Sequence, residues 1–545
     1  MKERTITAVS LIALCIIGVA AFLMAHFGQT DSTRFLLALF PLLVVLVGVA
    51  LLRQSGLTMA VVGLVLTALL AVVEFDATTA GVLQASAIGF LKSFGISIAV
   101  PATMLMIFLM RETGALQTVS KVIKQQVLGD EVQALYIGIG FGSFLTSLGV
   151  VTPALFPPLL ATMGFTPSAS VAIAVLGYDP TTSFSLLSIP ITLPASQFGL
   201  DPLSLAFKVA LFLPVVSTGF GFAILWLIGG RKSMRRGAVP ALVSSLALAF
   251  ACLGTVSLDH FTGVEFIPLR IVGVVAGLSA MGSLYAYQWL SHCRRNFQKP
   301  DDYPNRKEVL RSFSPWIILT VLAVIISVQQ IGTWLSNVLG TQEQIVIERT
   351  KVDLDVLSQI YTWIFVAVVV SLFTLRPSKE QVRKAFGVWV RRFPGPFLCF
   401  ALYFCMAFVM NASTMNTVLG VTLASVFGVG YVFVAASLGL FGAIVGGSET
   451  TSNILFYPVQ RTAYSNVQLS NPALGETGFM TVYGSHAVAG GIASSVTPAK
   501  INNAVVTIDA GKETESYVMR KHLIVAVLLT IATGLLTGLL VNIGI

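Results

Sequence analysis

The chain has 545 residues, of which 55% are hydrophobic and only 10% are charged, and its mean hydropathy is +0.87. Soluble domains carry about 25% charged residues, and several apolar runs here reach the roughly 20 residues that cross a bilayer. These values exclude an ordinary soluble domain and predict an all-α polytopic membrane protein. The net charge of +9 would suggest nucleic acid for a soluble protein, but here the basic residues cluster in short hydrophilic loops, so no nucleic-acid partner is expected. The five cysteines lack CxxC or Cys/His spacing, so we expect no disulfide framework, no metal and no cofactor.

The apolar runs, taken in chain order, give the expected membrane segments. Residues 1–27 combine a charged start with a long apolar run, which favours an uncleaved first helix over a signal peptide. Arg520, Lys521 and His522 are expected to begin a last helix. Between these ends the apolar runs are 34–52, 57–75, a segment ending near Met110, 203–229, 239–257, 267–289, 313–335, 356–375 and 394–410.

Four hydrophilic stretches hold most of the Lys and Arg, and they set the orientation. They are residues 111–124, 231–236, 293–311 and 376–392. Because basic loops stay in the cytoplasm, all four are expected there. This assignment of the basic stretches places the N-terminus in the cytoplasm and the C-terminus outside, with about 12–14 membrane segments.

Two regions, 133–200 and 412–510, do not fit plain helices. Both are rich in Gly, Pro, Ser and Thr yet apolar enough to lie at membrane depth, where irregular backbone survives only beside protein or a water-filled cavity. They also resemble each other, because FGSFLTSLGVVTPALFPPL (141–159) aligns with FGAIVGGSETTSNILFYPV (441–459). The first is entered from the cytoplasm and the second from outside, so we expect two inverted repeats with broken or re-entrant helices. That arrangement is typical of a secondary transporter whose site lies near the membrane midplane.

The topology divides the chain into four parts. We expect N-terminal helices over 1–110, a first repeat core over 111–230, central helices with basic loops over 231–411, and a second repeat core with the C-terminal helix over 412–545.

Glu449 is the first candidate site residue, because a charge at membrane depth is costly and indicates a site by default. Glycines before it let the backbone break, the hydroxyls and amide after it can bind a ligand, and a partly desolvated carboxylate can carry a proton. The alternative is a solvated Glu on a surface loop. The candidate substrate-binding residues around it are Gly446, Gly447, Ser448, Thr450, Thr451, Ser452 and Asn453, with Thr146, Ser147 and Thr152 in the first region.

Lys500 is the candidate partner of an anionic substrate, together with Ser494, Ser495, Thr497 and Asn503 in the same segment. The alternative is a Lys at the membrane edge whose side chain reaches the headgroups. Single hydroxyls and amides in such segments also serve ordinary helix packing.

Two further ionisable residues are candidates for proton coupling. Asp179, in GYDPTTSFS, is either a second proton site or the cap of the next helix. His486, in YGSHAVAGG, is either a proton relay or a hydrogen-bonded core histidine.

An intramembrane hydrolase is the catalytic alternative to transport. It would use Ser448 as the nucleophile and His486 as its base. The chain has no HExxH, no phosphate-binding loop and no Walker pattern, so an enzyme or nucleotide-driven pump is not expected.

GAIVGGSETTSNILF (442–456), AGGIASSVTPAKINNAV (489–505), and GKE and KH at 511–513 and 521–522 resemble the C-terminal signature of the lactate permease family. IGFGSFLTSLGVVTPALFPPLLATMGFTP (139–167) is similar to its other signature. The resemblance implies a carrier in the cytoplasmic (inner) membrane of a prokaryote that imports L-lactate, or D-lactate and glycolate, with protons. It also implies that Glu449 takes the place of the family's acidic residue.

Two departures from the family pattern bear on the substrate. TSLGVVTP (146–153) lacks the acidic residue of the first signature, and Lys500 stands where a small polar residue is usual. The expected substrate is therefore a small hydroxy-monocarboxylate. The alternative is another organic anion, with sodium coupling left open.

Overall fold

The computed structural model describes residues 31–50, 52, 54–124, 128–149, 152–177, 179–291, 303–328, 331, 334–335, 344–347, 350–353, 356–357 and 359–545. The first predicted helix and much of the basic stretch 293–311 lie outside these residues. Within the described part the protein is helical apart from one antiparallel hairpin, which pairs β1 (Gln344–Ile347) with β2 (Thr350–Asp353). The prediction of an all-α polytopic membrane protein is confirmed.

Ten helical stretches in the described part of the chain are long and apolar enough to cross a membrane. They are Asp31–Val49, Gly56–Glu74, Phe94–Glu112, Leu213–Arg236, Ala238–Thr262, Leu269–Ser291, Arg306–Ile326, Lys379–Ala412, Met415–Gly446 and Lys512–Asn542. Most of them agree with the apolar runs of the sequence, because a helix of about 20 apolar residues matches the hydrocarbon thickness. Three differ: the predicted run 313–335 is found at Arg306–Ile326, the run 356–375 forms only the shorter helix Ile360–Leu375, and Met415–Gly446 lies in the region 412–510, which is not expected from the sequence to contain a plain membrane-spanning helix.

The individual helices are bounded as follows. The N-terminal part holds α2 (Asp31–Ala50), α3 (Gly56–Glu74), α4 (Thr79–Lys92), α5 (Phe94–Ser97), α6 (Ala99–Glu112) and α7 (Ala115–Lys124). The first broken region holds α8 (Asp130–Leu135), η1 (Tyr136–Gly142), α9 (Ser143–Ser147), η2 (Thr152–Ala154), α10 (Phe156–Thr162), α11 (Pro167–Leu176), η3 (Thr182–Phe184), η4 (Leu186–Ser188) and α12 (Ile189–Phe198). The central part holds α13 (Pro202–Ala210), α14 (Leu213–Arg236), α15 (Ala238–Thr262), η5 (Leu269–Ile271), α16 (Val272–Ser291), α17 (Arg306–Ser327), α19 (Ile360–Leu375), α20 (Lys379–Arg392) and α21 (Pro394–Ala412). The last part holds α22 (Met415–Phe427), η6 (Gly428–Gly430), α23 (Tyr431–Gly446), α24 (Glu449–Ser470), α25 (Glu476–Ser494), α26 (Pro498–Val506) and α27 (Lys512–Asn542).

Three further differences from the sequence prediction concern α27, the pair α13 and α14, and α20. The last helix begins at Lys512, because Gly511 precedes it and Glu513 and Glu515 occupy its first turn, where carboxylates are favoured. The apolar run 203–229 divides into α13 and α14, with Pro214 near the start of α14, where its missing N–H costs nothing.

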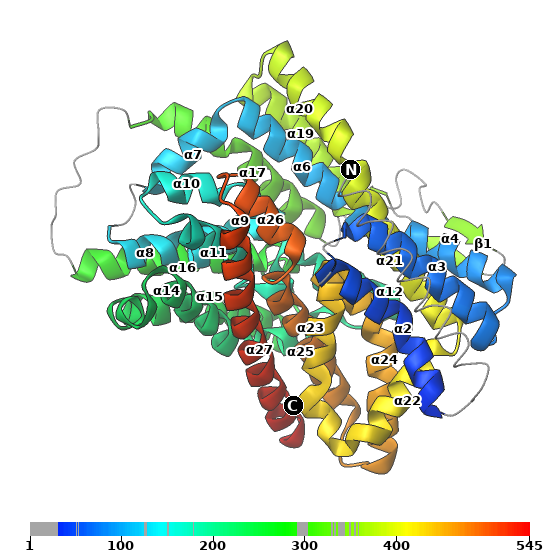
Figure 1. The fold of residues 1–545 in the computed structure, drawn as a ribbon. Helices are drawn as coiled ribbons and strands as arrows, with labels where there is room; N and C mark the ends of the chain where they lie inside the picture. Colours follow the sequence, from blue (N-terminus) through cyan, green and yellow to red (C-terminus); the bar gives the residue numbers. More distant parts are fainter. Residues whose placement is uncertain are drawn as a thin grey trace.

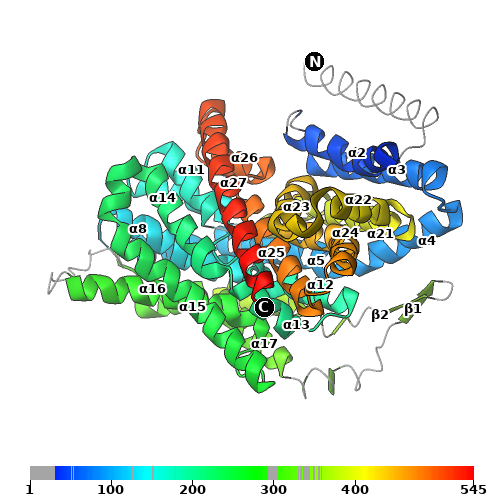
Figure 2. The ribbon, with the colours of Figure 1, turned by 90° about the horizontal axis from the view of Figure 1, so that it is seen from below.

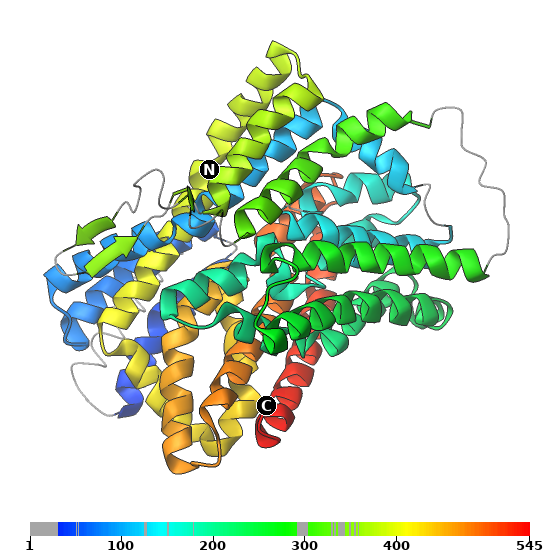
Figure 3. The ribbon, with the colours of Figure 1, turned by 180° about the vertical axis from the view of Figure 1, so that it is seen from behind.

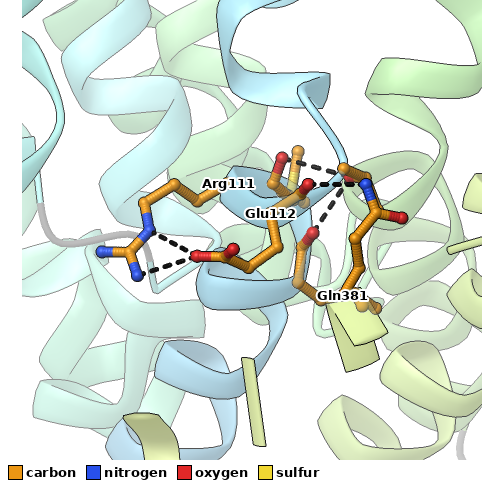
Figure 4. Close-up of polar contacts among 6 residues, drawn as sticks. Arg111, Glu112 and Gln381 are labelled. Carbon is orange, nitrogen blue, oxygen red and sulfur yellow. Dashed lines mark hydrogen bonds and ion pairs between the residues drawn. The ribbon is translucent and has the colours of Figure 1, made fainter. Parts of the chain in front are cut away.

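The third difference is the basic stretch 376–392, most of which forms helix α20. A capping box starts this helix, because the Ser378 hydroxyl accepts the Gln381 N–H and the Gln381 side chain accepts the Ser378 N–H. The Gln381 Nε2 atom also donates to the Glu112 carbonyl at 2.8 Å, and Arg111 pairs with the Glu112 carboxylate, as Figure 4 shows. The start of α20 is therefore fixed to the end of α6.

Segments far apart in the sequence lie side by side. Helices α3 and α4 pack on α21, and α2 packs on α22, so the blue and yellow helices form one side of the molecule (Figures 1 and 2). On the other side, η1 and α9 pack on α16, next to α14 and α15. The β-hairpin lies against α4 (Figure 3). Between the two sides, α23, α24, α25 and α27 contact one another, and this centre carries the second broken region.

Helices α14 and α27 run in opposite directions and define the two ends of this centre. The Lys521 ammonium lies 4.2 Å from the Trp226 ring centre, and Gly219 packs on Leu529. The basic segment 231–236 and the start of α27 therefore share one end. The C-terminus lies at the other, where the Thr481 hydroxyl donates to the Ile545 carbonyl.

The first broken region starts at the basic end and the second starts at the C-terminal end. The Ser233 hydroxyl donates to Glu131, at the beginning of the first region. In the second region, Phe433 near the start of α23 packs against Gly534 and Gly538 of α27, so the helix that leads to the first break begins near the C-terminus.

Both regions then follow the same path. In each, a helix ends near Gly149 or Gly447, two further helices follow (α10 and α11, or α24 and α25), and the chain leaves regular α-helix again at 179–188 or 495–497 before the next helix. One region begins at the basic end and the other at the C-terminal end, as the sequence predicts for inverted repeats.

Candidate functional site

The second break of the first region is strained. Thr182, Leu186, Leu187 and Ser188 all have positive φ angles between 43° and 57°. This conformation costs a non-glycine residue about 1–3 kcal/mol and is found where function requires it. The surrounding structure holds the segment in place, since the Ser188 hydroxyl donates to the Leu269 carbonyl at 2.8 Å.

Glu449 lies against this strained segment. Gly447 adopts φ +71°, which ends α23, and Ser448 caps α24 by accepting the Thr451 N–H at 3.2 Å. Glu449 is the first residue of α24, is only 7% exposed, and accepts a hydrogen bond from the Ser183 hydroxyl at Oε1. The alternative of a solvated surface-loop Glu is therefore wrong. The positive end of the α24 dipole and the Ser183 hydroxyl both favour the carboxylate form, whereas burial opposes it.

Two glycines of α25 allow this close approach. A Cβ atom at Gly491 would lie 2.9 Å from Glu449 Oε2 and 2.8 Å from the Thr182 Cβ atom. At Gly490 a Cβ atom would lie 3.2 Å from Glu449 Cγ. The pair therefore lets α25 touch both broken segments at one point.

Lys500 is placed by the second break of the other repeat. Its side chain is 17% exposed, and its ammonium donates to the Ser494 hydroxyl. The same ammonium lies 3.9 Å from Oδ1 of Asp179, whose side chain is 3% exposed. The side chain is thus directed into the protein, toward the break that holds Asp179. The next helix after Asp179 has Thr181 as its N-cap residue, so the alternative that Asp179 caps it is wrong.

Several buried polar atoms around these residues have no hydrogen-bond partner among the described residues. They are Asp179 Oδ2, Thr181 Oγ1, Thr182 Oγ1 and Asn453 Oδ1. The rest of the Asn453 side chain is fixed, because its Nδ2 donates to the Pro190 carbonyl at 2.9 Å. Buried polar groups are nearly always paired, so a cluster of unpaired ones beside two carboxyls and an ammonium is where a polar ligand fits.

The other predicted residues occupy different positions. Thr146 and Ser147 bond to the Ser143 carbonyl of their own helix, Thr152 bonds to the Ala174 carbonyl, and Ser495 and Thr497 bond to carbonyls one turn back. Gly446 packs against Thr451, and Thr450 is buried next to Glu449. Asn503 is exposed on α26.

His486 belongs to a separate buried network. Its Nδ1 accepts from Gln460 Nε2 at 2.9 Å, and its Nε2 faces the Ser452 hydroxyl at 3.1 Å. Gln460 in turn donates to the Ala435 carbonyl and accepts from the Tyr431 hydroxyl. Both ring nitrogens are thus engaged, as in a neutral, positioned imidazole. The hydrolase alternative needs His486 beside Ser448, but its hydroxyl neighbour is Ser452.

Sequence reasoning missed Thr181, Thr182 and Ser183. The available signal was the run GYDPTTSFS, in which only Asp179 was singled out. Hydroxyls carry little weight alone in a membrane helix, so their function could be recognised only once Glu449 lay beside them.

A family model described as L-lactate permease matches residues 34–544. The chain belongs to the L-lactate permease family. It is 25% identical to glycolate permease GlcA of Escherichia coli K12, over 93% of this chain and 97% of that protein. It is 23% identical to an L-lactate permease of Streptococcus iniae, over 80% and 92% of the two chains. It is 26% identical to an L-lactate permease of Bacillus subtilis, over 66% and 72%.

Among solved structures, this permease-family chain aligns with the MtrF protein of Neisseria gonorrhoeae, whose title describes a class of antimetabolite efflux pumps. The alignment covers 91% of this chain and 97% of MtrF, with 11% identity and a TM-score of 0.43. Membership of the permease family indicates a multi-pass transporter of small organic anions.

Proposed function

We propose that this protein imports a small hydroxy-monocarboxylate, L-lactate, D-lactate or glycolate, together with protons across the cytoplasmic membrane of a prokaryote. The relatives named as lactate and glycolate permeases support this substrate class. The single observation that carries the proposal is the buried cluster of Glu449, Asp179 and Lys500 at the point where broken helices of both repeats meet.

Each group of the cluster has a task in this scheme. Lys500 binds the substrate carboxylate, because a charge-assisted bond from an ammonium is the strongest contact available to it. The unpaired hydroxyls of Thr181 and Thr182 and the amide oxygen of Asn453 are the partners for the substrate hydroxyl. Glu449 carries the coupled proton, because a carboxyl buried against apolar helix faces and glycines can bind and release one.

The repeats supply the movement. We propose that the repeat cores, 111–230 and 412–545, hold the site and that the remaining helices, 1–110 and 231–411, support them. Alternating access then comes from motion of these cores about the breaks. The basic segment 231–236 and Lys512 face the cytoplasm in this orientation, and Asp201 and Ile545 face outside.

Single cysteines placed near Asp201 and near Lys512 in a cysteine-free background test the orientation. The first should react with an impermeant thiol reagent from outside and the second only from inside. Reaction of both from the same side would remove the inverted-repeat scheme.

Uptake of radiolabelled lactate and glycolate into proteoliposomes tests the function. An imposed pH gradient, acidic outside, should drive accumulation above that of protein-free vesicles, and sodium should have no effect. Uptake that follows a sodium gradient and ignores pH would favour the alternative, a sodium-coupled carrier. Uptake of neither substrate under any gradient would point to another organic anion.

A further inference from the structure

Asp179 and Lys500 form an ion pair that is loose and incomplete. The ammonium lies 3.9 Å from Oδ1, beyond hydrogen-bond distance, while Oδ2 is buried and has no hydrogen-bond partner among the described residues. The ammonium instead donates a hydrogen bond to the Ser494 hydroxyl. A buried ion pair stabilises the folded protein only when its geometry is good and its other polar atoms have hydrogen-bond partners. The Asp179–Lys500 pair meets neither condition, so stabilising the fold is not its function.

The substrate carboxylate and Asp179 are chemically alike, and both are attracted to Lys500. In the proposed transport cycle, the incoming substrate carboxylate pairs with Lys500 in place of Asp179, which then lacks its counter-charge. Two ionisable side chains act electrostatically on Asp179. They are Lys500 of α26 and Glu449 at the start of α24. A displaced, buried carboxylate beside a second carboxyl group must become neutral, because an unpaired buried charge is too costly.

We propose that Asp179 is a second proton-binding group, displaced from Lys500 by the substrate carboxylate, so that two protons accompany each substrate anion. The proposal rests on the proposed function and adds to it the number of protons and the movement of charge. The free Oδ2 atom of Asp179 receives the second proton, and Glu449 receives the first.

The charge balance closes over the cycle. The empty site holds one ammonium and two carboxylates, a net charge of −1. The loaded site holds the ammonium, the substrate carboxylate and two protonated carboxyls, a net charge of zero. A neutral loaded site crosses the membrane without electrostatic work, and the inside-negative potential drives the anionic empty site back outward. Each cycle therefore brings one net positive charge inward.

The test is potential-driven uptake in proteoliposomes that hold the full-length protein, with lactate and glycolate as the probes. A potassium diffusion potential, negative inside, is imposed with valinomycin at equal pH on both sides. The wild-type protein should take up substrate severalfold faster than without the potential. A tenfold proton gradient at zero potential should support accumulation approaching about a hundredfold, whereas one proton per substrate would limit it to about tenfold.

Asp179→Asn is the informative variant, because it keeps the shape of the side chain and cannot bind the second proton. It should still accumulate substrate in a pH gradient, with a limit near tenfold, and should lose its response to the potential. Asp509→Asn is the matched control, since Asp509 is an exposed Asp just beyond the C-terminal end of α26, and it should behave as wild type.

Two results would overturn the proposal: wild-type uptake that follows the pH gradient and ignores the potential, or an Asp179→Asn variant that keeps the wild-type response to the potential. If Asp179→Asn does not fold, the wild-type measurement alone decides. Failure of the proposed function is distinguishable, because the wild-type protein would then take up neither substrate under either gradient.

Discussion

Ser183 donates a hydrogen bond to Oε1 of Glu449, although 266 residues separate the two in the sequence. The bond joins the second break of the first repeat to the first break of the second. It therefore fixes the position of the proposed proton carrier relative to the strained segment 182–188.

Replacing Ser183 by Ala should lower the rate of pH-driven uptake by about tenfold or more. The variant removes a hydrogen bond to a charged group, which is worth about 1.5–3 kcal/mol, without changing the backbone. Ser185→Ala removes a hydroxyl from the same segment and is the matched control, with uptake expected near wild type. Equal rates for the two variants would show that the bond to Glu449 has no function in transport.

Lys500→Met should raise the apparent KM for lactate by about tenfold or more, because Met keeps the length of the side chain and loses its charge-assisted bond. The substitution Lys512→Met, at the exposed start of α27, serves as control and should leave the KM unchanged. A wild-type KM in a well-expressed Lys500→Met protein would place the substrate carboxylate elsewhere.

Gly491→Ala should abolish most uptake while leaving expression intact. The added methyl group would lie 2.9 Å from Glu449 Oε2 and 2.8 Å from Thr182 Cβ, so the segments that meet there must separate. Gly282→Ala in α16 adds the same methyl group where nothing lies within 4 Å, and this variant should transport normally. Uptake is measured in both after quantifying protein in the membrane, and normal uptake by Gly491→Ala would contradict the close packing around Glu449.

His486→Ala should destabilise the protein without changing the pH dependence of uptake. The substitution leaves one buried N–H of the Gln460 amide without its partner, at a cost of about 1–3 kcal/mol, whereas the Ser452 hydroxyl keeps its bond to the Gly439 carbonyl. Thermal unfolding of purified protein measures the first effect, and uptake rate against external pH measures the second. A stable variant with a shifted pH profile would instead make His486 a proton relay.

Much of the membrane architecture follows from the sequence, because segment length and apolar content determine which helices can span a bilayer. Gly56–Glu74 and Pro394–Ala412 lie within two residues of their predicted limits. The start of α27 was missed because its first two turns, Lys512–Met519, are polar and become recognisable as helix only through packing against α26. The polar pattern of 379–392 predicts a loop, whereas the segment forms α20, whose start is held by a tertiary contact between Gln381 and Glu112.

The sequence predicts which ionisable residues belong to the candidate site, but it does not predict which other side chains lie beside them. Glu449, Lys500 and Asp179 stand out because ionisable residues are rare at membrane depth. Ser183 and the unpaired hydroxyls of Thr181 and Thr182 do not, because only the three-dimensional meeting of the two repeats gives them a partner.

Glu449→Gln in proteoliposomes is the measurement that tests the central claim most directly. Gln keeps the shape and most of the hydrogen bonding of the side chain but cannot carry a proton. With an imposed pH gradient, the Gln variant should fail to accumulate lactate, while exchange of external labelled lactate for internal lactate should continue at a rate close to wild type. Glu449→Asp, which keeps an ionisable group one methylene shorter, should retain partial accumulation. Accumulation by the Gln variant at the wild-type rate would contradict the account, because Glu449 would then be structural.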